Sequence, residues 1–213
     1  KCMLITKFGH SCVLLDDGQT KILLDPGIYS NLAVDLVVDA VVITHAHQDH
    51  LDIEQLQKVM QNCSPRIITS TEVKTELAKH SIEVEILEDG GSATIKTFTI
   101  SGHGSEHAIM HPDLPKFQNT GYLINDKIFH PGDALFVPPT QIEVLLLPVS
   151  APWSKISETL DYISTVKAKI NFPIHDGFLT DGGAFYRFSK MWCEKIDAEF
   201  IEPELNKSYE LSI

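Results

Sequence analysis

The feature that most constrains the fold of this 213-residue chain is the stretch AVVITHAHQDHLDIEQLQ, at positions 40–57. Its apolar start, Ala40–Thr44, predicts a buried strand. Its second half predicts an amphipathic helix, because Asp52 is placed to cap the helix and Gln55 follows three residues later. A strand-to-helix loop therefore joins the two elements. The expected buried face of the helix is Ile53, Leu56, Val59 and Met60.

Four side chains that bind metals crowd this loop: His45, His47, Asp49 and His50. Imidazoles and a carboxylate are costly to bring together unless a cation lies among them. Residues two apart in extended backbone point the same way, so His45 and His47 can reach one ion. Asp49 and His50 follow as the chain turns, and they aim at a neighbouring point. Nitrogen and carboxylate ligands suit Zn²⁺, and also Mn²⁺ or Fe²⁺.

Two other interpretations of this cluster are weaker. Ordinary polar loop residues rarely place four metal-ligand side chains within six positions. A purely structural zinc staples distant segments and frequently uses thiols, whereas no cysteine lies near the cluster. The loop is therefore interpreted as part of a catalytic metal centre.

The rest of the chain alternates short β-rich runs with amphipathic stretches. Two mixed β-sheets packed face to face, with helices on their outer faces, would bury all of these runs. We therefore predict an α/β fold, a four-layer α/β/β/α sandwich forming a single domain over residues 1–213. Strands are expected over 2–8, 11–17 and 20–26 as an antiparallel meander, over 65–70, 83–87, 93–102, 107–111 and 169–175, and over 142–149 buried on both faces; a hairpin over 120–130 turns at Asn125–Asp126, and helices cover 71–80, 154–168 and 182–196.

Composition narrows the classes of partner. The formal net charge is −12, and Lys and Arg are scattered, so nucleic acid is a disfavoured partner. The longest apolar runs are strand-length, which argues against a membrane span, and the opening KCMLITKFGH lacks the marks of a secretory signal. The four cysteines show no C-x-x-C spacing; they are Cys2, Cys12, Cys63 and Cys193. Reduced thiols and a cytoplasmic location are therefore expected, although Cys2 and Cys12 could face each other across a hairpin.

Several segments together resemble the metallo-β-lactamase superfamily. THAHQDH is similar to its H-x-H-x-D-H signature, and LLDPG at 23–27 resembles its early strand end that carries an aspartate. FHPGDALF at 129–136 resembles the segment with its metal-bridging aspartate, and FPIHDG at 172–177 the segment with its last histidine, in the same order along the chain. The opening KFGHSCVLL and the final P-x-H are closest to the branch that holds L-ascorbate-6-phosphate lactonases and many Zn-dependent hydrolases.

The resemblance implies two divalent metal ions, with Zn²⁺ as the first expectation and Mn²⁺ or Fe²⁺ as alternatives. One ion would be bound by His45, His47 and a third histidine, the other by Asp49, His50 and His175. Asp133 would bridge both ions, with a hydroxide held between them. Without the resemblance, Asp133 could equally be a turn aspartate and His175 a capping or core histidine.

The third histidine is open among three positions in SGHGSEHAIMH: His103, His107 and His111. The family has a histidine at a strand end or turn in this segment. His107 is preferred over His103, and His111 comes last. The two that are not ligands would have other tasks, such as lining the pocket or bonding the substrate, and His103 is the first candidate for such a place.

Other residues are candidates for support of the site. His10, in FGHS, is either a turn histidine or a pocket residue that supports a ligand. Asp25 suits a plain turn, but the resemblance implies that it orients a metal-binding histidine through the free ring N–H. Trp153 and Phe178 lie on loops as pocket walls or simple packing, and Asp176 either joins the site or caps a turn.

The chemistry that the resemblance implies is hydrolysis of a small ester-like bond in a lactone, thioester or phosphoester. Two cations would activate a bridging water, Asp49 would orient it, and His175 or another pocket histidine could protonate the leaving group. A serine hydrolase is disfavoured because G-x-S-x-G is absent. The expected partner is a small-molecule substrate, an anionic one included, and a homo-oligomer is left open. The alternatives are a small cyclic-phosphate phosphodiesterase and a non-catalytic metal-binding protein on the same fold.

Overall fold

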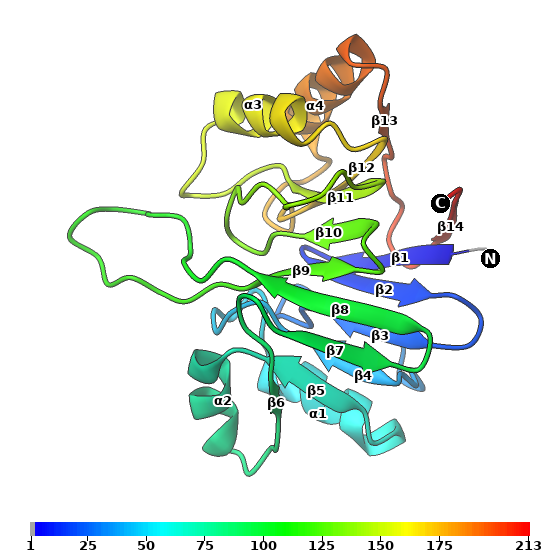
Figure 1. The fold of residues 1–213 in the computed structure, drawn as a ribbon, viewed down its shortest axis with the longest axis vertical. Helices are drawn as coiled ribbons and strands as arrows, with labels where there is room; N and C mark the ends of the chain where they lie inside the picture. Colours follow the sequence, from blue (N-terminus) through cyan, green and yellow to red (C-terminus); the bar gives the residue numbers. More distant parts are fainter. Residues whose placement is uncertain (1–2) are drawn as a thin grey trace.

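The computed structural model describes residues 3–213, so Cys2 lies outside the described residues. Two seven-stranded sheets form the centre of the molecule (Figure 1). Both are mixed, since each combines parallel and antiparallel neighbours. The predicted pair of mixed sheets is confirmed.

The first sheet begins with the predicted meander. Its first strands pair antiparallel, and from β3 onward its neighbours run parallel. Its C-terminal strand returns to pair beside the N-terminal strand. The spatial order is β14 (Ser208–Leu211), β1 (Met3–Gly9), β2 (Cys12–Asp16), β3 (Lys21–Leu24), β4 (Ala40–Val42), β5 (Arg66–Thr69) and β6 (Glu85–Ile86).

The second sheet is parallel from β10 to β13 and antiparallel from β10 to β7. The predicted strand over 93–102 is divided into two strands by a turn at Lys96, whose φ is 51°. The spatial order is β13 (Glu199–Phe200), β12 (Ile170–Ile174), β11 (Val144–Pro148), β10 (Ile128–His130), β9 (Gly121–Ile124), β8 (Phe98–His103) and β7 (Ser92–Ile95).

Alternation along the strands divides the core into three buried clusters. In β11, Val144 and Leu146 face the cluster between the sheets, whereas Leu145 and Leu147 face the helices. Ile22 and Leu24 of β3 likewise face the other sheet. Successive side chains of a strand point to opposite faces, so a sheet covered on both sides needs such a continuous apolar run. The prediction that 142–149 is buried on both faces is confirmed.

Four helices cover the outer faces of the sheets. Helices α1 (Ile53–Asn62) and α2 (Thr71–Ala78) pack against the first sheet, and α3 (Ile156–Val166) and α4 (Gly183–Lys195) pack against the second (Figure 1). These layers are the α/β/β/α sandwich that the sequence predicts.

The helix after the histidine cluster differs from its prediction in detail. Asp52 caps α1 by accepting a hydrogen bond from the Glu54 N–H, as predicted. Gln55 instead donates to the Ser30 carbonyl. Leu56 and Val59 are buried, but Met60 is exposed, because its position turns it away from the sheet.

The strand predicted over 107–111 is wrong. The segment belongs to a loop between β8 and β9 that extends far from the sheets (Figure 1). Two prolines, Pro112 and Pro115, lack the N–H groups that a strand ladder needs. The loop is attached at its base, where the His107 N–H donates to Phe117 O and the Ala108 N–H donates to Asp133 O.

Over residues 3–213, no helix combines the length and the apolar character that crossing a bilayer requires. The longest helix, α4, has 13 residues.

Candidate metal centre

Two groups of potential metal ligands lie at one edge of the two sheets. Each combines three histidines with one aspartate, and within each group the ligand atoms lie within 4.8 Å of one another. Most of these side chains are buried. The first group is His45, His47, His107 and Asp133, and the second is His10, Asp49, His50 and His175.

Strand ends bring the first group together. His45 and His47 follow β4, with their ring centroids 4.8 Å apart, and the ring of His107 lies 4.8 Å from that of His47. Asp133 follows β10, where the side-chain oxygen of Asn119 accepts its backbone N–H at 3.0 Å. The Nε2 atom of His107 lies 3.3 Å from Asp133 Oδ2.

The second group combines the same loop with the end of β12. The Nε2 atom of His175 lies 3.5 Å from Asp49 Oδ2 and 2.9 Å from Asp133 Oδ2. The Nε2 atom of His50 lies 2.9 Å from Asp133 Oδ1. Asp133 therefore stands between the two groups, with one oxygen toward His50 and the other toward His175 and His107.

The ring nitrogens show which atoms are available to a cation. The Nδ1 atoms of His50, His107 and His175 face oxygen acceptors, namely Asp25 Oδ2 at 2.7 Å, Ala108 O at 2.6 Å and Ser150 O at 2.6 Å. A neutral ring that donates from Nδ1 keeps its lone pair on Nε2. Within residues 3–213 the buried atoms without a hydrogen-bond partner include His45 Nε2 and His107 Nε2, together with His50 Nε2 and Asp133 Oδ1, whose 2.9 Å approach does not form a hydrogen bond. Buried polar atoms are rarely left unpaired, so these atoms fit a bound cation.

The buried carboxylate of Asp25 organises the wall behind the second group. It accepts hydrogen bonds from the Thr44 N–H at 2.8 Å, the Thr44 hydroxyl at 2.7 Å and His50 Nδ1 at 2.7 Å. His130 Nε2 lies 3.1 Å from the same carboxylate. Asp25 thus contacts the Nδ1 side of the His50 ring, and its role in orienting a metal ligand stays a prediction.

Backbone geometry lets the segments approach closely. Gly27 lies so near the ligand loop that a Cβ there would stand 1.9 Å from the Asp49 carbonyl oxygen. Asp25 and His175 have φ values of 43° and 59°, a conformation uncommon for residues other than glycine. Such strain persists where surrounding contacts enforce it, and it is common at functional sites.

Burial and neighbouring charges move the pKa values of the site in opposite directions. Burial lowers the pKa of His45 and His47. Burial also acts to lower the pKa of His175, but the Asp133 carboxylate outweighs it and raises that pKa to about 9. Asp133 and Asp25 likewise raise the pKa of His50 against the effect of its burial. In the metal-free protein His50 and His175 therefore carry protons that a cation must displace.

This electrostatic arrangement predicts a pH dependence for the metal-free protein. The folded pKa of His175 is raised from 6.5 to about 9, so its contribution to stability is full below pH 6.5. That contribution is lost as the pH rises through about 9. Urea unfolding midpoints of metal-free protein should therefore fall across this window. Metal affinity should rise over the same window, because a smaller fraction of His175 rings carries a proton that the metal must displace. A midpoint that rises between these pH values would contradict the assignment.

The three candidate histidines of one segment separate clearly. His107 lies in the first group. His103 Nε2 lies 2.8 Å from the Ser101 hydroxyl, and its ring faces Phe136, outside both groups. His111 is exposed, with its Nδ1 accepting the backbone N–H of Asp113.

The sequence also matches a known protein family. A family model described as a beta-lactamase superfamily domain matches residues 4–175. The chain belongs to this family. The matched region therefore includes both groups of potential metal ligands in this superfamily member, from the β1–β2 turn to His175. Resemblance to the L-ascorbate-6-phosphate lactonase branch stays a prediction.

Relatives of this superfamily member span most of its length. Protein Rv0786c of Mycobacterium tuberculosis is 36% identical over 184 residues, covering 83% of this chain and 85% of its own. The UPF0173 metal-dependent hydrolase MJ1163 of Methanocaldococcus jannaschii is 25% identical over 225 residues, covering 98% of this chain and 100% of its own. The structure of Igni18, a metallo hydrolase from Ignicoccus hospitalis, superposes with a TM-score of 0.79 at 20% identity over 100% of both chains, and it supports the fold.

Three residues near the site were missed or left open by sequence reasoning. His130, in FHPGD, is fully buried behind the second group. Lys7 is buried and donates to Asp176 Oδ2 at 2.6 Å and to Pro173 O at 2.7 Å, so Asp176 forms an ion pair rather than a cap. Trp153 donates its indole N–H to Asp133 Oδ2 at 2.8 Å. Their positions in FHPGD, in strand β1 and in SAPW carry no periodic signal for these contacts.

Proposed function

We propose that this superfamily member is a metal-dependent hydrolase that uses two divalent cations to cleave a small ester-like bond. The observation that carries the proposal is the pair of ligand groups on either side of Asp133, with buried Nε2 atoms that lack hydrogen-bond partners. Relatives of matching length are called metal-dependent hydrolases, which supports the reaction class. Nitrogen and carboxylate ligands without thiols favour Zn²⁺, with Mn²⁺ and Fe²⁺ as alternatives.

The residues divide into ligands and supporting groups. His45, His47 and His107 would bind one cation, and Asp49, His50 and His175 the other. Asp133 would serve both, because its Oδ2 lies near His107 of the first group and His175 of the second, while its Oδ1 lies near His50. When bound, divalent cations lower the pKa of water to give a nucleophile near neutral pH and polarise the oxygen of the bond that is cleaved.

The opening of the site indicates the kind of substrate. Asp49 is the most accessible carboxylate of the centre, with 22% of its side chain exposed. Aromatic rings border the histidines around it. The Phe178 ring lies 5.3 Å from the His175 ring and is 46% exposed, and the Phe117 ring lies 4.5 Å from the His47 ring. Tyr29 packs against Phe178 at 5.8 Å. Such a rim suits an uncharged, apolar group next to the scissile bond.

The experiment is metal analysis of protein purified without added metal, followed by a substrate panel on the same sample. The panel compares lactones and thioesters of short and long acyl chains with bis(p-nitrophenyl) phosphate. We expect about two divalent ions per chain and hydrolysis of at least one ester class, with longer acyl chains preferred. Preference for the phosphodiester would favour the phosphodiesterase alternative. Bound metal without turnover of any compound would favour a metal-binding protein without catalysis.

A further inference from the structure

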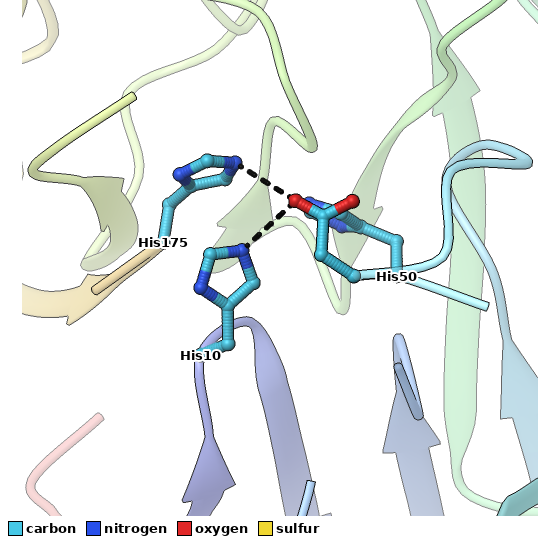
Figure 2. A group of neighbouring side chains, drawn as sticks. His10, His50 and His175 are labelled. Carbon is cyan, nitrogen blue, oxygen red and sulfur yellow. Dashed lines mark hydrogen bonds and ion pairs between the residues drawn. The ribbon is translucent and has the colours of Figure 1, made fainter. Parts of the chain in front are cut away.

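His10 lies among the potential ligands of the second group, at the tip of the β1–β2 hairpin. A two-residue turn, His10–Ser11, separates the paired residues Gly9 and Cys12. The His10 ring is buried and points, together with His175, at one carboxylate oxygen (Figure 2). That oxygen is Asp49 Oδ2, which lies 3.2 Å from His10 Nε2. Position alone would allow His10 to be a fourth protein ligand.

The contact on the other ring nitrogen decides between the two roles. The backbone N–H of Gly177 donates a hydrogen bond to His10 Nδ1 at 2.9 Å. An N–H donor requires a lone pair on Nδ1, so the neutral ring carries its proton on Nε2. That Nε2–H faces the Asp49 oxygen. Turning the ring over would place carbon atoms at both positions and lose both hydrogen bonds.

His10 therefore has the opposite polarity to the ligand histidines. His50, His107 and His175 face oxygen acceptors with Nδ1, which leaves the Nε2 lone pair free for a cation. His10 faces an N–H donor with Nδ1, so its Nε2 carries hydrogen and offers no lone pair. His10 therefore lies close to the second group but has no free nitrogen lone pair there with which to bind a cation.

The backbone fixes this orientation from both sides. The His175 N–H donates to the His10 carbonyl oxygen at 3.3 Å, two residues before Gly177 binds the ring. A Cβ on Gly177 would stand 2.9 Å from His10 Cβ and 3.0 Å from Nδ1, so the close approach depends on glycine. The rings of His175 and Phe178 pack against His10 at 4.2 Å and 4.8 Å.

We propose that His10 is a positioning residue and not a metal ligand. Locked as the Nε2–H tautomer by the Gly177 backbone, it donates a hydrogen bond to Asp49 Oδ2 and fixes the direction of that carboxylate. Asp49, His50, His175 and the shared Asp133 would then be the residues that hold the second cation, without His10. The inference rests on the proposed function for the identity of those ligands.

Nitrogen NMR tests the tautomer directly, without any substrate. Long-range ¹H–¹⁵N correlation spectra of metal-free and Zn²⁺-loaded wild-type protein report which ring nitrogen of each histidine carries hydrogen. The signals of His10 are assigned by their absence in His10→Gln. We expect His10 to carry hydrogen on Nε2 in both states, and His50 and His175 to carry it on Nδ1 once zinc is bound. A zinc-loaded protein in which His10 carries hydrogen on Nδ1 would overturn the proposal.

Metal binding and kinetics test the role. His10→Leu should keep the wild-type number of Zn²⁺ ions, whereas the matched variant His50→Leu should lose one. His10→Leu should lower kcat by about 10–100-fold, the range for groups that orient ligands. His10→Gln should recover part of that loss, because its amide N–H can still donate to Asp49. Loss of an ion in His10→Leu, or an unchanged kcat, would each contradict the proposal.

These outcomes can be told apart from failure of the proposed function. If wild-type protein binds zinc but hydrolyses no compound, the hydrolase assignment fails while the tautomer and the ion count still test His10. If hydrolysis is present and His10→Leu loses an ion, the hydrolase assignment stands and the positioning role is wrong.

Discussion

Replacing Asp133 by alanine is expected to lower hydrolysis by more than about 10³-fold and to reduce bound metal. The expected loss exceeds the 10–100-fold range typical of residues that only orient ligands, because Asp133 would be a ligand itself. Its buried carboxylate lies 2.9 Å from His50 Nε2 and 2.9 Å from His175 Nε2, and it accepts the Trp153 indole N–H. One substitution therefore removes the group shared by both halves of the centre.

The measurement is kcat/KM on the best compound of the panel, together with the number of ions per chain. Circular dichroism checks that the variant folds. Asp113→Ala is the matched control, because that aspartate lies in an exposed loop with 91% of its side chain accessible. It should keep wild-type activity and metal content. An Asp133→Ala variant that is folded and retains both ions and turnover would remove Asp133 from the centre.

Asp25→Ala is expected to give the largest loss of stability, about 3–5 kcal/mol, the range for removing one partner of a buried charged pair. Asp25 is fully buried and accepts hydrogen bonds from the Thr44 N–H, the Thr44 hydroxyl and His50 Nδ1. The alanine leaves these donors, and the nearby His130, without an acceptor. Zinc affinity should also fall, by about 10–100-fold, because His50 loses the group that orients its ring.

Urea unfolding of metal-free protein measures the stability term, and zinc titration measures the affinity. Thr44→Val serves as the graded comparison, because it removes only the hydroxyl and should cost about 1 kcal/mol. If the free energy of unfolding of Asp25→Ala lay within about 1 kcal/mol of the wild-type value, the carboxylate could not be the centre of this hydrogen-bond network.

The parts of the fold with strong local patterns could be predicted from the sequence. The strand–loop–helix around the histidine cluster has a continuous apolar run, a capping aspartate and a helical apolar face, and it formed as expected except at Gln55 and Met60. The loop that carries His107 has no such pattern. The His107 N–H donates to Phe117 O and the Ala108 N–H donates to Asp133 O, contacts that no local pattern announces, so the choice among three histidines depended on resemblance rather than on spacing.

The roles of single ring nitrogens could not be predicted, since they depend on backbone groups far away in sequence. The N–H that fixes His10 belongs to Gly177, 167 positions away. Lys7 stands in a strand where alternation gives no hint of its burial, and its partner Asp176 comes from the opposite end of the chain. Sequence patterns report which side chains can meet, whereas the donors and acceptors they find are set by the assembled sheets.

The most direct test of the account is a crystal structure of zinc-loaded protein with anomalous diffraction recorded on both sides of the zinc absorption edge. We predict two anomalous peaks, one among His45, His47, His107 and Asp133, and one among Asp49, His50, His175 and Asp133, with His10 Nε2 bonded to Asp49. A single peak, or peaks away from these side chains, would contradict the two-cation centre.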